Sequence, residues 1–351
     1  MPTKNNIQWL DSLRSFATIG VIIIHVSSPL VNMSYGKNMD FWWIGNVVDS
    51  ITRYSVPLFL MLSGATLLNK EYGIIEFYRK RVSRVLVPFL FWMLAYWVFR
   101  WAMLSFKQQP RSFEAILQWG IELFLKEGIS KHLWYIYMIL FIYLYVPFLG
   151  KILRKLSNSH ILLMLLGWVI FSFICKSMSI NQYGWSNGFG DKLLGYFLHT
   201  GYLVFGFYLS NLNFKPNNVK VYSVITFFLC AITTAILTYI SSQNAHKLDL
   251  SYYGYFTPIA ILQCSAIFLC VKDITVRNKF VLWLQNTISN YSYGIYLVHI
   301  MVIGIFFRYG IFWTMTHPLI SLPLVSILTL ITSCGIIFVL RKIPFGKYVA
   351  G

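Results

Sequence analysis

Long apolar runs separated by short polar connections make up most of the chain. In a helix, about 20 apolar residues cross the roughly 30 Å of hydrocarbon in a bilayer. Ten runs come close to that length, at about residues 13–33, 44–68, 84–106, 134–150, 159–178, 193–211, 221–241, 255–271, 289–308 and 320–340. The pattern predicts an all-α, polytopic bundle of about ten transmembrane helices, forming one membrane domain over residues 1–351.

Two of the connections carry an amphipathic pattern. In residues 110–130, apolar side chains recur near helical spacing between charges, which predicts a helix at the outer membrane surface. Residues 274–286 predict a similar helix on the inner side. The first apolar run follows Asp11 and Arg14 and has no small-residue cleavage site. We therefore expect it to be the first transmembrane helix and not a removable signal peptide.

The composition agrees with a membrane protein, since 57% of the residues are hydrophobic and only 11% are charged. Soluble domains carry about 25% charged residues, so an ordinary cytosolic enzyme is excluded. The chain has 29 Lys and Arg, 11 Asp and Glu and a net charge of +18. The cations concentrate in alternate connections, which predicts both termini in the cytoplasm and explains the charge without nucleic acid. The five cysteines lie in apolar runs without metal-ligand spacing, and we interpret them as packing residues.

Arg14 and His25 are the most informative polar residues of the first run. They are 11 residues apart, close to three helical turns, so they share one face with His25 about 16 Å deeper. Ionisable groups at mid-depth usually face a cavity or a partner. The stripe therefore predicts a polar channel that starts at the cytoplasmic surface. Pairing with Asp11 is a sufficient explanation of Arg14 alone, whereas the two residues on one face favour a functional role.

Asp49 and Arg53 stand one helical turn apart in the second run, at a depth similar to that of His25. Two interpretations stay open, because a buried pair of this kind either fixes helix packing or binds a substrate. Pro57 and the Ser63-Gly64 pair follow in the same run and are expected to kink the helix or to pack it closely against a neighbour.

Arg81 and Arg84 belong to a basic loop, FYRKRVSRVLVP, at the inner membrane surface. Planar guanidinium groups one turn apart suit phosphate, but the positive-inside rule and lipid headgroups explain the cluster equally well. His132 and Trp134 open the fourth run at its outer end, and His299 lies near mid-depth in the ninth. Structural roles are expected for the remaining histidines, which are His160, His199, His246 and His317.

Taken in order, these motifs resemble the acyltransferase 3 family of integral membrane O-acyltransferases. The chain contains no HExxH, GxSxG, Walker A or GxGxxG pattern. Ser15 and Ala65 stand where the family usually has glycine and an aromatic residue, and neither change affects a charged position. The likeness is greatest to enzymes that O-acetylate enterobacterial common antigen and related surface polysaccharides. It rests on the R-x10-H segment WLDSLRSFATIGVIIIH and on SVPLFLMLSG, FYRKRVSR, HLWYIY and SYGIYLVH, which together span nearly the whole chain.

The resemblance implies transfer of an acetyl group from cytoplasmic acetyl-CoA to a sugar hydroxyl of a lipid-linked or surface glycan in a bacterial inner membrane, without a metal. In this interpretation His25 is the general base or a transient acyl carrier. Arg14, Arg81 and Arg84 hold the phosphates of CoA. Arg14 is also expected to be a catalytic residue, together with His25. The candidates for substrate binding are Asp49, Arg53, Ser63, His132, Trp134 and His299.

Two other functions fit the same residues. An exporter of polysaccharide or lipid-linked sugar would use the polar stripe as its path, although the chain lacks the internal symmetry common in transporters. A non-catalytic membrane protein would hold lipid headgroups at Arg81 and Arg84. We expect no additional catalytic domain after residue 340, and therefore no second transfer or hydrolysis step.

Overall fold

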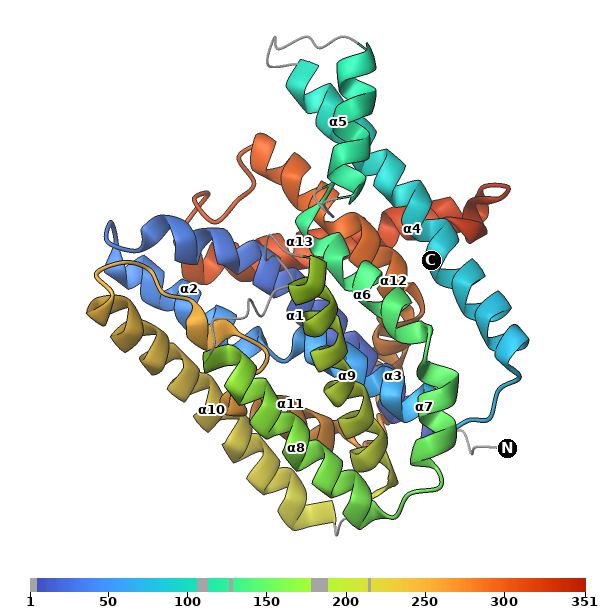
Figure 1. Ribbon diagram of the computed structural model, residues 1–351. Coiled ribbons are helices and arrows are strands. Elements are labelled where there is room, and N and C mark those ends of the chain that lie inside the picture. The colour runs from blue at the N-terminus through green and yellow to red at the C-terminus, as the bar shows by residue number, and fades with distance from the viewer. Residues whose placement is uncertain (1–4, 106–112, 126–128, 178–188, 214–215) are drawn as a thin grey trace.

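The computed structural model describes residues 5–105, 113–125, 129–177, 189–213 and 216–351, and in these ranges it contains helices and connections but no strand (Figure 1). The α-helices are α1 (Asn5–Ser34), α2 (Met39–Thr52), α3 (Ser55–Leu67), α4 (Ile74–Ser105), α5 (Phe113–Leu125), α6 (Trp134–Tyr143), α7 (Val146–Leu153), α8 (Asn158–Ser177), α9 (Phe189–Asn211), α10 (Pro216–Asn244), α11 (Pro258–Val271), α12 (Lys279–Arg308) and α13 (Pro318–Lys342). Three short 3-10 helices are η1 (Lys131–Leu133), η2 (Ser251–Tyr253) and η3 (Gly346–Tyr348). The prediction of an all-α polytopic bundle is confirmed.

All ten predicted spans fall on helices, but two of them are not continuous. In the described ranges, eight segments are long and apolar enough to cross a membrane. The run at 134–150 is a bent pair, α6 and α7, with 59° between them. The run at 44–68 is divided into α2 and α3 at Arg53 and Tyr54. Pro57 accounts for this second break, because it has no N–H to donate to the carbonyl of Arg53 four residues earlier.

The structure corrects two local expectations. The basic segment around Arg81 and Arg84 is not a loop, because α4 already begins at Ile74 and carries both residues in its first turns. Residues 279–286 are not a separate surface helix either, since they form the start of the long α12. The predicted helix in 110–130 is present as α5, and parts of that range, 110–112 and 126–128, lie outside the described residues.

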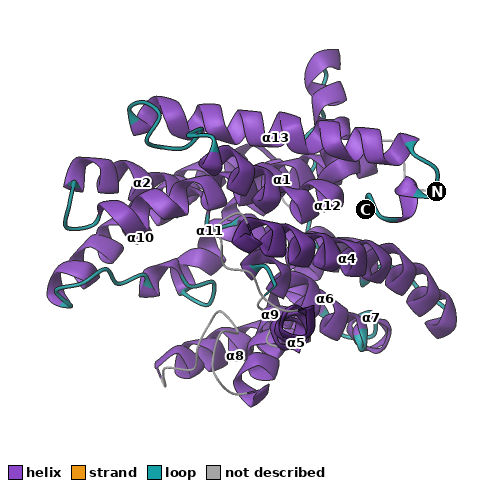
Figure 2. Ribbon diagram, turned by 90° about the horizontal axis from the view of Figure 1, so that it is seen from above, coloured by secondary structure: helices purple, strands orange, loops and turns teal. Residues whose placement is uncertain are grey.

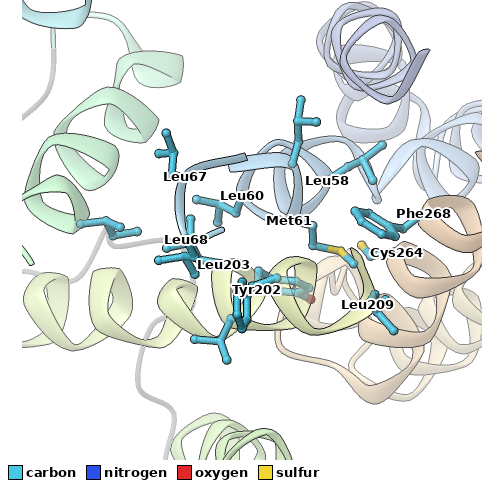
Figure 3. Close-up of a cluster of buried hydrophobic side chains, with 14 of the residues drawn as sticks. Leu58, Leu60, Met61, Leu67, Leu68, Tyr202, Leu203, Leu209, Cys264 and Phe268 are labelled. Atoms are coloured by element: carbon cyan, nitrogen blue, oxygen red, sulfur yellow. The ribbon is translucent and has the colours of Figure 1, made fainter. Parts of the chain in front are cut away.

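Helices α3 and α9 cross closely in the core (Figure 3). A Cβ atom on Gly64 would lie 1.8 Å from the carbonyl oxygen of Leu203, and one on Gly206 would lie 1.9 Å from that of Met61. Glycine at both positions therefore allows the two backbones to touch, as small residues do in membrane helix pairs. Leu58, Met61 and Leu203 pack at this crossing and are completely buried.

Helix α1 runs through the middle of the bundle and contacts α2, α3, α12 and α13 (Figure 2). Its polar edge faces α12. Ser12 Oγ donates to Gln285 Oε1 at 3.0 Å, and Ser15 Oγ donates to the carbonyl oxygen of Gln285 at 2.9 Å. These buried bonds orient the polar stripe of α1 toward α12 and away from lipid.

Candidate active site

A cavity of about 740 Å³ opens between α1, α3, α4, α6 and α12. Four of the predicted site residues line it, namely Arg14, Ser63, Arg81 and Arg84. Its other walls are largely aromatic and aliphatic, with Phe59, Ile136, Ile139, Tyr135, Tyr143 and Tyr296 among them. The cavity therefore combines cationic side chains with a largely apolar lining.

Arg14 pairs with Asp11, as its position in the sequence suggested, and it also lines the cavity. Its Nη1 atom donates to Asp11 Oδ1 at 2.9 Å and to Ser289 Oγ at 2.8 Å. The hydroxyl of Ser289 in turn donates to the same Asp11 oxygen at 2.6 Å. The guanidinium is thus fixed between α1 and α12, yet its side chain keeps 33% exposure and forms part of the cavity wall.

Arg81 and Arg84 differ from Arg14 in having no acidic partner among the residues that the structure describes. In the ranges that the structure describes, neither forms an ion pair with a carboxylate. Arg81 is half-buried, Arg84 is exposed, and Arg81 is close enough to Arg14 for their charges to interact. Three guanidinium groups that face one cavity with a single acidic neighbour favour binding of a polyanion.

Three histidine rings meet next to Tyr296, which lines this cavity. The ring centroids of His25 and His299 are 5.2 Å apart, those of His132 and His299 are also 5.2 Å apart, and those of His25 and His132 are 6.4 Å apart. They come from α1, α12 and η1. The sequence predicted that His25 and His299 share a depth, but it gave no reason to expect His132 beside them. Within the described ranges, no group of His, Cys, Asp or Glu is arranged to hold a metal ion.

The hydrogen bonds of His299 define its protonation. Its Nδ1 atom lies 2.7 Å from the carbonyl oxygen of Tyr296 and 3.2 Å from that of Ile295. Since a carbonyl oxygen only accepts, Nδ1 carries the proton, and Nε2 is left as an acceptor. That Nε2 atom is completely buried and has no partner among the described residues. A buried acceptor of this kind is suited to hold a neighbouring imidazole or a substrate group in place.

Tyr296 separates the cavity from the histidines. It lines the cavity, and its ring centroid is 5.4 Å from that of His132 and 5.8 Å from that of His299. Its hydroxyl donates to the carbonyl oxygen of His132. The three histidines themselves are not among the lining residues that the structure describes. Among the described residues, the cavity therefore stops short of the histidines, and Tyr296 lies at that boundary.

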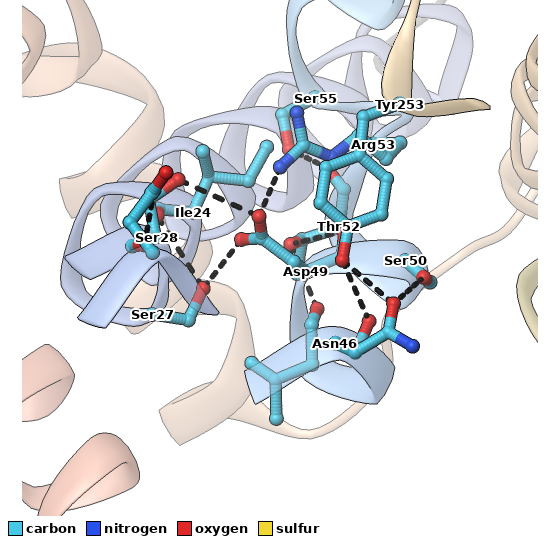
Figure 4. A network of polar contacts seen from close by, with 12 residues as sticks. Ile24, Ser27, Ser28, Asn46, Asp49, Ser50, Thr52, Arg53, Ser55 and Tyr253 are labelled. Atoms are coloured by element: carbon cyan, nitrogen blue, oxygen red, sulfur yellow. Dashed lines mark hydrogen bonds and ion pairs between the residues drawn. The ribbon is translucent and has the colours of Figure 1, made fainter. Parts of the chain in front are cut away.

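Asp49 and Arg53 form a buried ion pair that belongs to a wider network (Figure 4). Asp49 is inaccessible to solvent and accepts hydrogen bonds from Ser27 Oγ at 2.6 Å and from Ser28 Oγ at 3.5 Å. The guanidinium of Arg53 lies over the ring of Tyr253, 4.0 Å from its centroid. Arg53 is also close enough to His25 for their charges to interact. The pair both connects α1 to α2 and borders the histidines, so neither of the two interpretations is eliminated.

Two predicted substrate-binding residues have mainly internal contacts. Trp134 stacks on Tyr255 with 6.4 Å between ring centroids and lies 5.5 Å from the ring of His199. Ser63 donates to the carbonyl oxygen of Phe59 at 2.9 Å while lining the cavity. Their roles in binding stay predictions.

Sequence reasoning missed several lining residues, and for some of them a signal was present. Ser292 and Tyr296 are two of them, and together with Ser289 and the predicted His299 they recur near helical spacing along α12. Lys347, which also lines the cavity, lies after the last apolar run, where no periodicity marks it.

The fold and the cavity define a multi-pass membrane protein with a cationic internal site. The profile of the acyltransferase 3 family, described as an acyltransferase domain, matches residues 7–340. The chain belongs to this family and is a membrane acyltransferase. Neither a curated protein nor a solved structure matches it.

Proposed function

We propose that this acyltransferase moves an acetyl group from cytoplasmic acetyl-CoA to a sugar hydroxyl of a lipid-linked or surface glycan. The observation that carries the proposal is the cavity lined by Arg14, Arg81 and Arg84, whose apolar end meets the histidine cluster at Tyr296. A donor with several phosphates and a long, thin arm fits that combination. The rise of about 16 Å from Arg14 to His25 is similar to the length of an extended pantetheine arm.

In the proposed reaction, His25 takes the proton of the acceptor hydroxyl as the oxygen attacks the thioester carbonyl carbon. The C–S bond then breaks, and the CoA thiolate leaves and receives that proton from the imidazolium. The products are the acetylated sugar and CoA with a free thiol, and His25 is again neutral. In the alternative route, a ring nitrogen of His25 attacks the thioester carbonyl carbon, the C–S bond breaks and the CoA thiolate leaves. The acceptor oxygen then attacks the acyl-histidine, the C–N bond breaks, and the hydroxyl proton passes through His25 to the thiolate.

The remaining residues support this chemistry in the proposal. Arg53 stabilises the developing oxyanion or holds the acceptor, and Asp49 keeps it in position. His132 and His299 orient His25, because their rings border it on two sides. We place the protein in a bacterial inner membrane with both termini in the cytoplasm, so that acetyl-CoA enters from the side of Arg81 and Arg84.

Purified protein in detergent tests the proposal. Wild type is expected to release CoA thiol from acetyl-CoA when a lipid-linked or surface-glycan acceptor is present, and His25→Ala is expected to lose about 10²–10⁴-fold of that rate. His160→Ala is the matched control, because His160 is exposed and bonds only to Ser157. Folded wild type that neither binds nor consumes acetyl-CoA would reject the proposal and leave the exporter as the stronger interpretation.

A further inference from the structure

The segment that follows α13 folds back onto the bundle and reaches the cavity. Trp92 Nε1 donates to the carbonyl oxygen of Val349 at 2.9 Å, and Arg341 Nη2 donates to that of Gly351 at 2.6 Å. Ala350 is completely buried. Residues 343–351 are therefore fixed between α4 and α12, although the family match ends at residue 340.

Two backbone features make this return possible. Phe345 has a φ of +63°, in the left-handed region that reverses the chain after a helix. On α12, a Cβ atom at Gly294 would lie 2.2 Å from the carbonyl oxygen of Ala350. Only glycine at 294 allows the segment to approach α12 so closely. The position of the turn that follows Phe345, η3, is thus set by contacts with α4 on one side and with α12 on the other.

This turn adds a cation to the cavity. Lys347 lines the cavity together with Arg14, Arg81 and Arg84, whereas none of its described lining residues is Asp or Glu. The side chain of Lys347 is exposed, and its Nζ atom lies 5.1 Å from the centroid of the Tyr348 ring. Asp11 offsets the charge of Arg14, and the excess of positive charge that remains around the cavity favours an anion with several charges.

We propose that Lys347 is a ligand for the phosphates of the donor, an inference that rests on the proposed use of acetyl-CoA. The donor carries a pyrophosphate and a separate 3′-phosphate at its nucleotide end. The paired guanidiniums of Arg81 and Arg84 suit the pyrophosphate because both project from one turn of α4. The single ammonium of Lys347 acts as a point charge from η3, which packs against α4, and contacts the 3′-phosphate.

The test compares two donors on one set of variants. We expect Lys347→Gln to weaken binding of acetyl-CoA about fivefold by titration calorimetry, while acetyl-3′-dephospho-CoA binds wild type and variant alike. Lys347→Arg should restore most of the affinity. Lys342→Gln is the matched control, since Lys342 lies over Phe338 at 4.3 Å and is absent from the described cavity lining.

The outcomes separate this inference from the proposed function. Unchanged acetyl-CoA affinity in Lys347→Gln, with normal binding by wild type, would overturn the role of Lys347 and leave the proposed function intact. If Lys347→Gln lost the same factor of affinity for acetyl-CoA and for acetyl-3′-dephospho-CoA, the assignment of Lys347 to the 3′-phosphate would be overturned. Wild type that binds neither donor would reject the proposed function and this inference together.

Discussion

The imidazole of His299 lies 5.2 Å from that of His25, measured between ring centroids, although the two residues come from opposite ends of the chain. The contact exists because α1 and α12 pack side by side with Ser12 and Ser15 bonded to Gln285. His299 is fully buried, and its orientation is fixed by two carbonyl oxygens of its own helix. The packing of α1 against α12 therefore places His299 beside the histidine of the R-x10-H segment.

The first prediction concerns His299 as a positioning residue. Replacing it by leucine removes the Nε2 acceptor beside His25, and we expect kcat to fall about 10-fold or more with little change in the KM for acetyl-CoA. His199→Leu is the matched control, because His199 is also buried and its Nδ1 bonds a carbonyl oxygen four residues earlier, that of Gly195, at 2.6 Å. Equal losses of kcat in the two variants would mean that His299 is merely structural.

The second prediction separates phosphate binding from membrane orientation. Arg81→Gln and Arg84→Gln should each raise the KM for acetyl-CoA about 10-fold and reduce its dependence on ionic strength, because each removes a charged contact to the donor. Lys80→Gln removes the same charge from the same helix turn, but Lys80 is outside the described cavity lining. If all three variants keep the donor KM of wild type and differ only in abundance, the positive-inside explanation is correct.

The third prediction distinguishes the two roles that are open for Asp49 and Arg53. Asp49→Leu alone leaves Arg53 charged and buried, so we expect it to lose about 3–5 kcal/mol of stability. Asp49→Leu combined with Arg53→Met replaces the pair by apolar side chains and should regain most of that stability. Thermal unfolding measures the stability of both variants. Acetyl transfer by the double variant shows whether activity also needs the ion pair. A stable double variant with full activity would assign the pair to helix packing only.

The fourth prediction concerns Tyr296 as the barrier between the cavity and the histidines. Tyr296→Ala should connect the two spaces and admit water to the thioester, which raises the rate of acetyl-CoA hydrolysis without an acceptor. Tyr296→Phe keeps the ring and removes only the hydrogen bond to the carbonyl of His132, so it should hydrolyse acetyl-CoA as slowly as wild type. Thiol release in the absence of acceptor distinguishes the two, and equal rates would show that the ring is no barrier.

The fifth prediction tests the crossing of α3 and α9. Gly64→Ala places a methyl group 1.8 Å from the carbonyl oxygen of Leu203, so the helices must separate, at a cost of about 1–3 kcal/mol. Gly167→Ala, in α8, meets nothing within 4 Å and should stabilise its helix by about 0.5–1 kcal/mol. Unfolding midpoints in one detergent compare the two. A Gly64→Ala protein as stable as wild type would mean that the crossing tolerates a wider spacing.

The sequence by itself determined the fold class and the part of the candidate site that lies on α1. Apolar length decides which segments can cross a bilayer, and helical periodicity alone places Arg14 and His25 on one face of α1. The order of motifs identified the family that the profile match to residues 7–340 then established. These properties are local, so they need no knowledge of which helices become neighbours.

Only the tertiary structure decided which distant residues share the site. Helix packing brings His132 and His299 to His25, inserts Tyr296 between them and the cavity, and returns Lys347 to Arg81 and Arg84. The break at Arg53 and Tyr54 and the bend between α6 and α7 also escaped the hydropathy pattern, because a run stays apolar whether its helix continues or breaks. Such contacts depend on side-chain shape and on close approach at glycines such as Gly64 and Gly294, which a one-dimensional pattern of polarity does not record.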